Sequence, residues 1–429
     1  MSTTHPADPR RPQEADLQDA APKTASNGTK AVQHTRITLG GVQRLTLAAR
    51  PHSDGTLVEQ IQQTLAGMNQ AIAEQPLAMT VTSQTLFVRC VADIAAVQHE
   101  LDACYGDRMP ATTFVVQAPL SGKALAIEAW AIGGDAVKID FPRAGTVTVE
   151  YDGLRWIYIG GITAPADSTS AYDETQSIFK DMVHALELEG AGFNDVTRIW
   201  LYQAGITELE MERVEGLERY RELNRSRADF FDRLEDAAGM PVCSRGRTLF
   251  PPSTGIGMTE GNLTASCTAL QTSRKEVRLI PLENPNQTAA FDYARRFSAK
   301  SPKFSRAMAM VSADYTTTWV SGTASILDSE SVHLDDIEKQ TEQTIDNIEA
   351  LIGPENLSRH GAEGAGAQLS DLVRVRIYVK HKEDYAKCRA VCERRLGSIP
   401  AIYVFADVCR SELLVEIEGI SLSNITSER

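Results

Sequence analysis

The feature that most constrains the fold is an internal repeat. Two stretches present the same order of predicted elements: a strand, a glycine-containing loop, an amphipathic helix and a second strand. These elements are residues 156–163, 173–186 and 194–202 in the first stretch, and residues 319–326, 335–348 and 370–379 in the second. Apolar residues recur at helical spacing in the helices, as at Ile178, Met182 and Leu186. The repeat predicts two units of one architecture, related by duplication.

Further elements complete each unit. A second helix is predicted at residues 217–234 in the first unit and at residues 384–396 in the second. The chain then closes with a predicted β-hairpin, formed by residues 402–409 and 413–420 around a short polar turn. We therefore expect an α+β fold in which each unit is a mostly antiparallel sheet with helices packed on one face.

The units are assigned to residues 36–239 and 240–429. Residues 1–35 are polar and lack periodicity, which predicts a disordered tail; a partner-binding arm is the alternative. The net charge of -14 argues against a nucleic-acid surface, which needs a basic face. No run of 18 apolar residues and no apolar signal core occur, so we expect a cytoplasmic protein without a membrane segment.

The sequence offers little sign of a metal or dinucleotide site. The seven cysteines are scattered, and Cys388 and Cys392, one helical turn apart, are interpreted as helix packing. His184 and His333 have no partner at metal-ligand spacing. Residues 255–257 (GIG) lack the third glycine and the following helix of a dinucleotide-binding loop. We expect neither a metal nor an organic cofactor.

The second unit resembles the YjgF-like fold, also called chorismate-mutase-like. The resemblance rests on residues 321–325 (SGTAS), the helix at 340–348 (QTEQTIDNI) and the closing strand at 415–418 (VEIE). Proteins of this fold are usually trimers with ligand sites between subunits. The resemblance implies a fold and not an activity.

Three other stretches are similar to the chorismatase family, whose members cleave the enolpyruvyl ether of chorismate. They are residues 220–231 (YRELNRSRADFF), 249–257 (LFPPSTGIG) and 407–418 (DVCRSELLVEIE). The similarity covers residues 150–421 well, and residues 36–149 only loosely. The imine deaminases of the fold carry Pro-x-Arg before the last strands, where this chain has Pro400-Ala401-Ile402. Deaminase activity would therefore lack its carboxylate anchor.

The family resemblance implies two Tyr/Arg pairs that hold the two carboxylates of chorismate. Tyr220 and Arg227 are seven residues apart on a predicted helix and so share a face. Tyr293 and Arg306 resemble the second pair, and Arg306 opens an alternating apolar run where a charge is unusual. Guanidinium groups suit this role because they bind carboxylates with two hydrogen bonds. A surface arginine at 227 and a strand-end salt bridge at 306 are the alternatives.

Glu416 is the expected general acid. It alternates with Leu413, Val415 and Ile417 on the predicted closing strand, so it points away from their face, together with Glu418. Partial burial would raise its pKa and keep it protonated. The family resemblance assigns to Glu416 the protonation of the enolpyruvyl methylene carbon. Catalysis by Glu418, or a solvated strand face carrying both carboxylates, remains open.

Cys409 and Gly322 are expected to select the product. In the predicted hairpin, Cys409 lies diagonal to Glu416, at about 7 Å. A lone strand cysteine is normally core filler. Within the family, however, cysteine and glycine at these positions resemble the branch that forms 3-hydroxybenzoate, whereas alanine-like residues accompany the branch that forms a dihydroxycyclohexadiene carboxylate.

Three hypotheses follow for the function. The first is a chorismatase that releases pyruvate and 3-hydroxybenzoate, with some 4-hydroxybenzoate possible as a second product. The second is a chorismate hydrolase that releases pyruvate and the diol. The third is a YjgF-like protein that binds small acids without catalysis. In each case the predicted partner is a small molecule, chorismate in the first two, and the duplication makes a monomer plausible because one chain could supply the contacts of a trimer.

Overall fold

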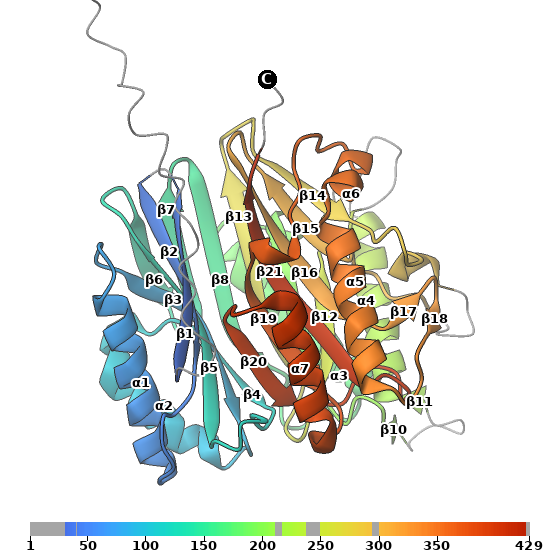
Figure 1. Ribbon diagram of the computed structural model, residues 1–429, viewed down its shortest axis with the longest axis horizontal. Coiled ribbons are helices and arrows are strands. Elements are labelled where there is room, and N and C mark those ends of the chain that lie inside the picture. The colour runs from blue at the N-terminus through green and yellow to red at the C-terminus, as the bar shows by residue number, and fades with distance from the viewer. Residues whose placement is uncertain (1–30, 40, 211–216, 237–248, 294–299, 426–429) are drawn as a thin grey trace, which may run out of the picture.

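The computed structural model describes the chain at residues 31–39, 41–210, 217–236, 249–293 and 300–425. The strands of these residues form three large sheets that lie side by side, with helices on the outside of the molecule (Figure 1). Within the described ranges, no helix is both long and apolar enough to cross a membrane.

The first sheet has the strand order β1-β2-β5-β3-β4. Its strands are β1 (Val32–Leu39), β2 (Val42–Ala49), β3 (Thr80–Val88), β4 (Ala111–Val116) and β5 (Leu125–Gly133). Two helices, α1 (Leu57–Ala73) and α2 (Asp93–Tyr105), pack on one face and bury Leu65 and Leu101 in a common core with the strands. Helix α1 begins at a capping box of Thr56 and Glu59, which satisfies two backbone donors at the helix start.

The second and third sheets have the orders β12-β9-β13-β8-β7-β6 and β14-β15-β16-β21-β19-β20. The second sheet consists of β6 (Lys138–Arg143), β7 (Thr146–Tyr151), β8 (Leu154–Thr163), β9 (Val196–Ala204), β12 (Ser253–Met258) and β13 (Thr264–Thr272). The third consists of β14 (Arg278–Leu282), β15 (Ala307–Val311), β16 (Tyr315–Ala324), β19 (Leu372–Val379), β20 (Ala401–Phe405) and β21 (Val415–Asn424). In both sheets the last strand of the unit inserts between two earlier ones, so their topology is the same.

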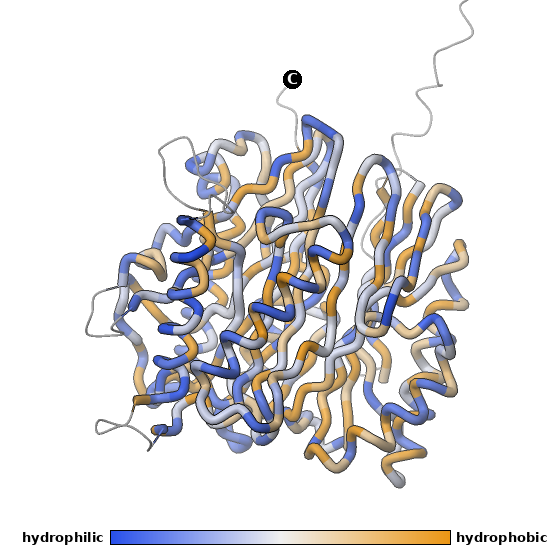
Figure 2. Tube along the Cα trace, turned by 180° about the vertical axis from the view of Figure 1, so that it is seen from behind, coloured by the Kyte–Doolittle hydropathy of each residue, from blue (hydrophilic) through white to orange (hydrophobic). Residues whose placement is uncertain are grey.

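Helices cover the outer face of these two sheets as well. They are α3 (Ala171–Glu187) and α4 (Arg219–Asp236) on the second sheet, and α5 (Ile337–Ile352), α6 (Pro354–Arg359) and α7 (Tyr385–Leu396) on the third. Two short ribbons complete the elements, β10 (Leu209–Glu210) with β11 (Leu217–Glu218), and β17 (Ile326–Leu327) with β18 (Glu330–Ser331). Hydrophilic and hydrophobic residues alternate along the helices that face the viewer in Figure 2, as expected for helices with one buried face.

The inner faces of the three sheets pack against one another. In the third sheet, Val415 and Ile417 point into the core beneath the helices. Trp319 and Ile420 point the other way, into a cluster shared with the first and second sheets. Each sheet is therefore buried on both sides, which explains why strands such as β19 are buried along their whole length.

The α+β class with mostly antiparallel sheets and helices on one face is confirmed, and the structure has three such sheets where the sequence analysis recognised two. The range 36–239 holds nearly all of the first sheet and part of the second, whose remaining strands β12 and β13 lie beyond residue 250. The expected boundary near residue 240 lies outside the described residues. The sequence repeat was recognised only between the units that form the second and third sheets, hereafter the second and third units.

Two local predictions need correction. Residues 32–35, assigned to the tail, belong to β1 and pair with β2; the rest of the predicted tail, up to residue 30, lies outside the described residues. The predicted closing hairpin does not form, because β20 pairs in parallel with β19 while β21 lies between β16 and β19. Helix α7 connects β19 to β20, and such a crossover returns the chain in the same direction.

Candidate active site

One pocket lies between the second and third sheets, beside helix α4. It encloses an empty volume of about 1150 Å³, including the solvent at its mouth. All seven residues predicted for the site line this pocket: Tyr220, Arg227, Tyr293, Arg306, Gly322, Cys409 and Glu416. They come from α4, from β16, from β21 and from three positions outside the strands and helices, so the fold brings together residues that lie up to 196 positions apart in the sequence.

Arg227 lies on the face of α4 that is turned toward the pocket. Its side chain is buried, and its guanidinium donates to Asn224 Oδ1 at 2.5 Å and to Ser253 Oγ at 3.5 Å. The Nε of Arg227 has no hydrogen-bond partner. No carboxylate among the described residues pairs with Arg227. Tyr220 lies on the same face of α4, as the spacing of seven residues predicted, and it also lines the pocket. A buried cation with a free donor is suited to an anionic ligand.

Arg306 supplies a second buried guanidinium. It directly precedes β15, and it donates to the hydroxyl of Tyr293 and, at 3.1 Å, to Thr288 O. Its Nε also lacks a partner, and no ion pair joins it to a carboxylate of the described chain. The ring of Phe304 lies between the two cations, with its centroid 5.1 Å from Arg227 Cζ and 5.4 Å from Arg306 Cζ.

Glu416 and Glu418 share a face of β21 but differ in their environment. The carboxyl of Glu416 is buried at the pocket, where no donor of the described chain bonds it, and burial together with the charge of Glu418 raises its pKa to about 8. Glu418 instead bonds Arg198 Nη2 at 2.7 Å and Arg376 Nη1 at 2.9 Å. These two guanidinium groups lower the pKa of Glu418 despite its burial.

The two glutamates therefore differ in protonation at neutral pH. Glu416 retains its proton, whereas Glu418 is ionised and occupied by structural partners, among them Trp200 and Thr254. Environments that push the pKa values of neighbouring carboxyls apart are typical of acid–base sites. Only Glu416 of the two lines the pocket, which favours it over Glu418 as a proton donor.

Gly322 lies directly beside the carboxyl of Glu416. A Cβ atom at position 322 would stand 1.8 Å from Glu416 Oε1 and 3.1 Å from Thr254 Cγ2. Any side chain at this position would therefore force the Glu416 carboxyl to move. The glycine leaves the Glu416 carboxyl its present position and leaves space in the pocket.

Cys409 reaches the pocket from a loop rather than from a strand. The expected hairpin would have placed it diagonal to Glu416 across a ladder; instead, it follows β20 in the connection that leads back to β21. Its thiol still lies close to Glu416 and Tyr220, and burial raises its pKa to about 12. The thiol is thus protonated at neutral pH and is no thiolate nucleophile.

The backbone of β12 fixes the position of this loop. The Gly257 amide donates to Asp407 O at 2.9 Å, and a Cβ at position 257 would lie 2.6 Å from that oxygen. Gly257 thus allows a close approach between the backbones of β12 and this loop.

Several residues of the site were not predicted from the sequence. Asn224 bonds Arg227 from one helical turn earlier, a spacing that the sequence does display. Phe304, Ser253 and Arg410 also line the pocket, but only the tertiary fold brings them there. Ser253 and Arg410 lie within the stretches 249–257 and 407–418 that resemble the family, but nothing in the sequence singled them out there, and Phe304 lies in none of these stretches.

Comparisons with known proteins agree with this geometry. The chain is 33% identical over 280 residues to a 3-hydroxybenzoate synthase of Streptomyces hygroscopicus, a match that spans 64% of this chain and 76% of that protein. It is 32% identical over 281 residues to a chorismatase of Streptomyces rapamycinicus, covering 63% of this chain and 77% of the relative. No protein-family model matches the sequence.

A solved structure extends the match. The crystal structure of a chorismatase aligns with a TM-score of 0.62 and 26% identity, over 80% of this chain and 93% of that one. The predicted α+β, YjgF-like fold is confirmed by this alignment. The extent of these matches shows that the chain belongs to the chorismatase family.

Proposed function

We propose that the protein cleaves the enolpyruvyl ether of chorismate and releases pyruvate and 3-hydroxybenzoate. The observation that carries the proposal is the combination of two buried, carboxylate-free guanidinium groups with a buried carboxyl that keeps its proton, all lining one pocket. Chorismate is a cyclic dianion whose carboxylates need two separate cations. The names of the curated relatives point to the same chemistry.

Arg227 and Arg306 hold the two carboxylates in this proposal. Each guanidinium has a free Nε–H, so each can add a charged hydrogen bond without giving up its present partners. Phe304 between them offers an apolar surface for the cyclohexadiene ring. Tyr220 and Tyr293 complete the two clamps with their hydroxyl groups.

Glu416 acts as the general acid. It donates its proton to the methylene carbon of the enolpyruvyl group, and the resulting oxocarbenium ion is captured by water or by the neighbouring ring hydroxyl. The ether bond then breaks, and pyruvate leaves. When the ring aromatises, its 4-oxygen departs as water if water captured the oxocarbenium ion, or as the keto oxygen of pyruvate if the ring hydroxyl did. The ring proton returns to the Glu416 carboxylate, so chorismate converts to pyruvate and 3-hydroxybenzoate with no net uptake of water.

Cys409 assists the ring chemistry as a neutral thiol. It lies beside Glu416 and Tyr220 in the pocket, and its raised pKa leaves a proton on sulfur that can be shared with the departing ring oxygen. Gly322 leaves room for the ring to shift after the first step. The hydrolytic alternative needs only water at the oxocarbenium ion, and yields the diol.

The test is to incubate the purified protein with chorismate and to quantify pyruvate and the ring products separately. Equal amounts of pyruvate and 3-hydroxybenzoate are expected. Pyruvate with the diol would identify the hydrolytic branch, and binding without pyruvate would identify the non-catalytic, acid-binding alternative. Some 4-hydroxybenzoate beside the main product is compatible with the proposal.

The role of Cys409 is tested by Cys409→Ala. We expect pyruvate release to stay measurable while 3-hydroxybenzoate falls and the diol rises. Cys388→Ala is the matched control, because Cys388 is buried on α7, away from the pocket, and should cost about 1 kcal/mol of stability without changing the products. Equal yields of pyruvate and 3-hydroxybenzoate from Cys409→Ala, at native rates, would remove Cys409 from the mechanism.

A further inference from the structure

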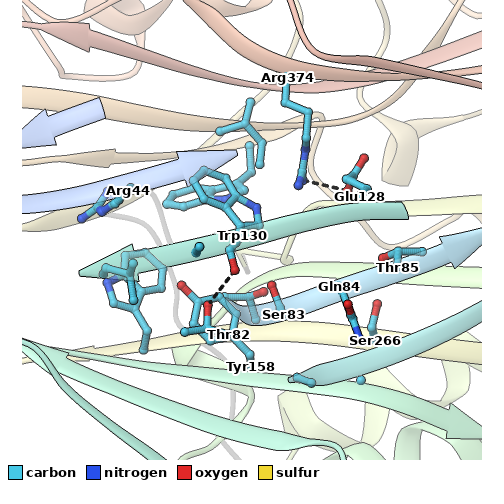
Figure 3. Close-up of a pocket in the computed structure, with 18 of the residues that line it drawn as sticks. Arg44, Thr82, Ser83, Gln84, Thr85, Glu128, Trp130, Tyr158, Ser266 and Arg374 are labelled. Atoms are coloured by element: carbon cyan, nitrogen blue, oxygen red, sulfur yellow. Dashed lines mark hydrogen bonds and ion pairs between the residues drawn. The ribbon is translucent and has the colours of Figure 1, made fainter. Parts of the chain in front are cut away.

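A second cavity lies where the inner faces of the three sheets meet. Its empty volume is about 940 Å³, the solvent at its opening included, and it shares no lining residue with the active-site pocket. Figure 3 shows Arg44 at one end, Trp130 in the middle, and the pair of Arg374 and Glu128 at the other end. The reaction proposed above uses none of these residues.

The charges that line this central cavity do not balance. Three arginines and one glutamate face it. Glu128 Oε1 is shared by Arg374 Nη2 at 3.0 Å and Arg376 Nη2 at 2.6 Å, and Arg376 also reaches Glu418. Arg44 has no share in this network. The cavity is thus locally positive, although the whole chain carries a net charge of -14.

Arg44 is a buried cation without a counter-ion. Its side chain is 9% exposed, and no carboxylate among the described residues pairs with it. Its guanidinium donates to the hydroxyl of Tyr151 and lies 5.3 Å from the ring centroid of Tyr151 and 5.9 Å from that of Tyr315. Burial raises the pKa of Tyr151, so this hydroxyl stays neutral. Phenols accept hydrogen bonds from a guanidinium but do not compensate its charge.

A buried hydroxyl without a hydrogen-bond partner lies in the same layer of the fold. Arg44 pairs with Ile132 on β5, and Thr317 pairs with Leu422 on β21, the equivalent strand of the third sheet. The Thr317 hydroxyl is buried, lines the cavity and has no hydrogen-bond partner. The Arg44 guanidinium therefore lacks a counter-ion, the Thr317 hydroxyl lacks a hydrogen-bond partner, and a bound anion would provide both.

The residues in the walls of the cavity indicate which chemical group the ligand carries besides its anionic group. All four tryptophans of the sequence line it, and Tyr151 and Tyr158 add two more aromatic rings; the tryptophans are Trp130, Trp156, Trp200 and Trp319. We infer that the central cavity is a second binding site, which takes a small planar aromatic carboxylate with its carboxylate on Arg44. A phosphate group would leave the aromatic walls unused, and a neutral aromatic would leave Arg44 uncompensated. The inference does not depend on the proposed function.

The four tryptophans make the site directly observable. The active-site pocket contains no tryptophan, so intrinsic fluorescence reports on the central cavity. We expect benzoate, titrated into the full-length protein, to change this fluorescence in a saturable manner. Benzamide, which has the same shape without the charge, should not do so. No saturable change with benzoate, or an equal response to benzamide, would overturn the inference.

Two substitutions distinguish the central cavity from the active site. Arg44→Gln should weaken benzoate binding at least tenfold, whereas Arg306→Gln should leave the fluorescence titration unchanged. The opposite pattern would place benzoate in the active-site pocket and refute the inference. Arg44→Lys keeps the buried charge and replaces the glutamine variant in this test if that variant does not fold. It should weaken benzoate binding at least fivefold. Unchanged affinity for benzoate would count against the inference. Crystals of the unaltered protein with 4-iodobenzoate should show iodine in the central cavity, and iodine only at Arg306 would contradict it.

Discussion

Replacing Glu416 by glutamine separates the two consequences of its buried carboxyl, for catalysis and for stability. The side chain is 4% exposed, and its pKa rises from an ordinary value of 4.5 to about 8. At pH 7 about nine tenths of the molecules then carry the proton that the proposed mechanism needs. Glutamine cannot donate a proton to carbon. We expect pyruvate release to fall at least ~100-fold while chorismate still binds.

The same substitution should stabilise the protein. A carboxyl whose pKa is higher in the folded state gives its full contribution to stability below pH 4.5, and this contribution is lost as the pH rises toward 8. At pH 7 the loss relative to a neutral side chain is about 3 kcal/mol, and at pH 5 it is less than about 1 kcal/mol. Glutamine is neutral throughout, so Glu416→Gln should gain stability over the wild type as the pH rises.

Urea unfolding at several pH values between 5 and 8 measures this difference. Initial rates of pyruvate release, followed to about pH 10, should decline above about pH 8 in the wild type. The control is Glu412→Gln, because Glu412 lines the same pocket but accepts a hydrogen bond from Ser331 Oγ at 2.7 Å, and its pKa is lowered. This variant should not gain stability. If the stability curves of Glu416→Gln and wild type run parallel, Glu416 is ionised in the folded protein, and the reasoning fails.

Four further substitutions test the neighbours of this carboxyl. Arg227→Lys and Arg306→Lys keep the charge but lose the planar fork, so KM for chorismate should rise by an amount equivalent to roughly 1–3 kcal/mol; unchanged kinetics in a folded variant would make that arginine structural. Glu418→Gln leaves two buried arginines without their shared carboxylate and should destabilise the protein by about 3 kcal/mol in urea unfolding; an unaltered midpoint would contradict this. Gly322→Ala should displace the Glu416 carboxyl, since the new methyl would lie 1.8 Å from its oxygen, and slow pyruvate release by ~10-fold; a native rate would show that the carboxyl relaxes without loss.

The fold was predictable where local patterns determine it. Amphipathic helices and alternating strands gave the elements of the second and third units within a few residues, for example α3 at Ala171–Glu187 and β9 at Val196–Ala204. The order of strands was harder, because β21 follows β20 in the chain but inserts two strands away. Pairing of this kind depends on the crossover helix α7 and on the packing of the whole sheet, which short-range alternation does not encode.

The residues of the pocket were predictable for a different reason. The resemblance to the chorismatase family assigned them, Arg227 above all. Only at Arg306 and Glu416 does the sequence itself show a conflict, because a charge stands in an alternating apolar stretch that the fold buries. Phe304 and Ser253 show no such conflict with their surroundings. Their contribution comes from lying beside the arginines after folding, which the sequence does not reveal.

The three sheets also explain why one chain has a single site of this kind among its described residues. Corresponding strands place Ala126 opposite Phe87, Thr264 opposite Tyr202, and Glu416 opposite Tyr378. The three positions are therefore equivalent in the pseudo-threefold arrangement, yet only the third carries a carboxyl. A symmetric trimer would have to repeat the buried acid at each interface. A fused chain can have the buried acid, and its unfavourable effect on stability, at one interface only. The fusion also allows Arg44 to occur in the first sheet alone. The corresponding positions are Trp156 in the second sheet and Thr317 in the third.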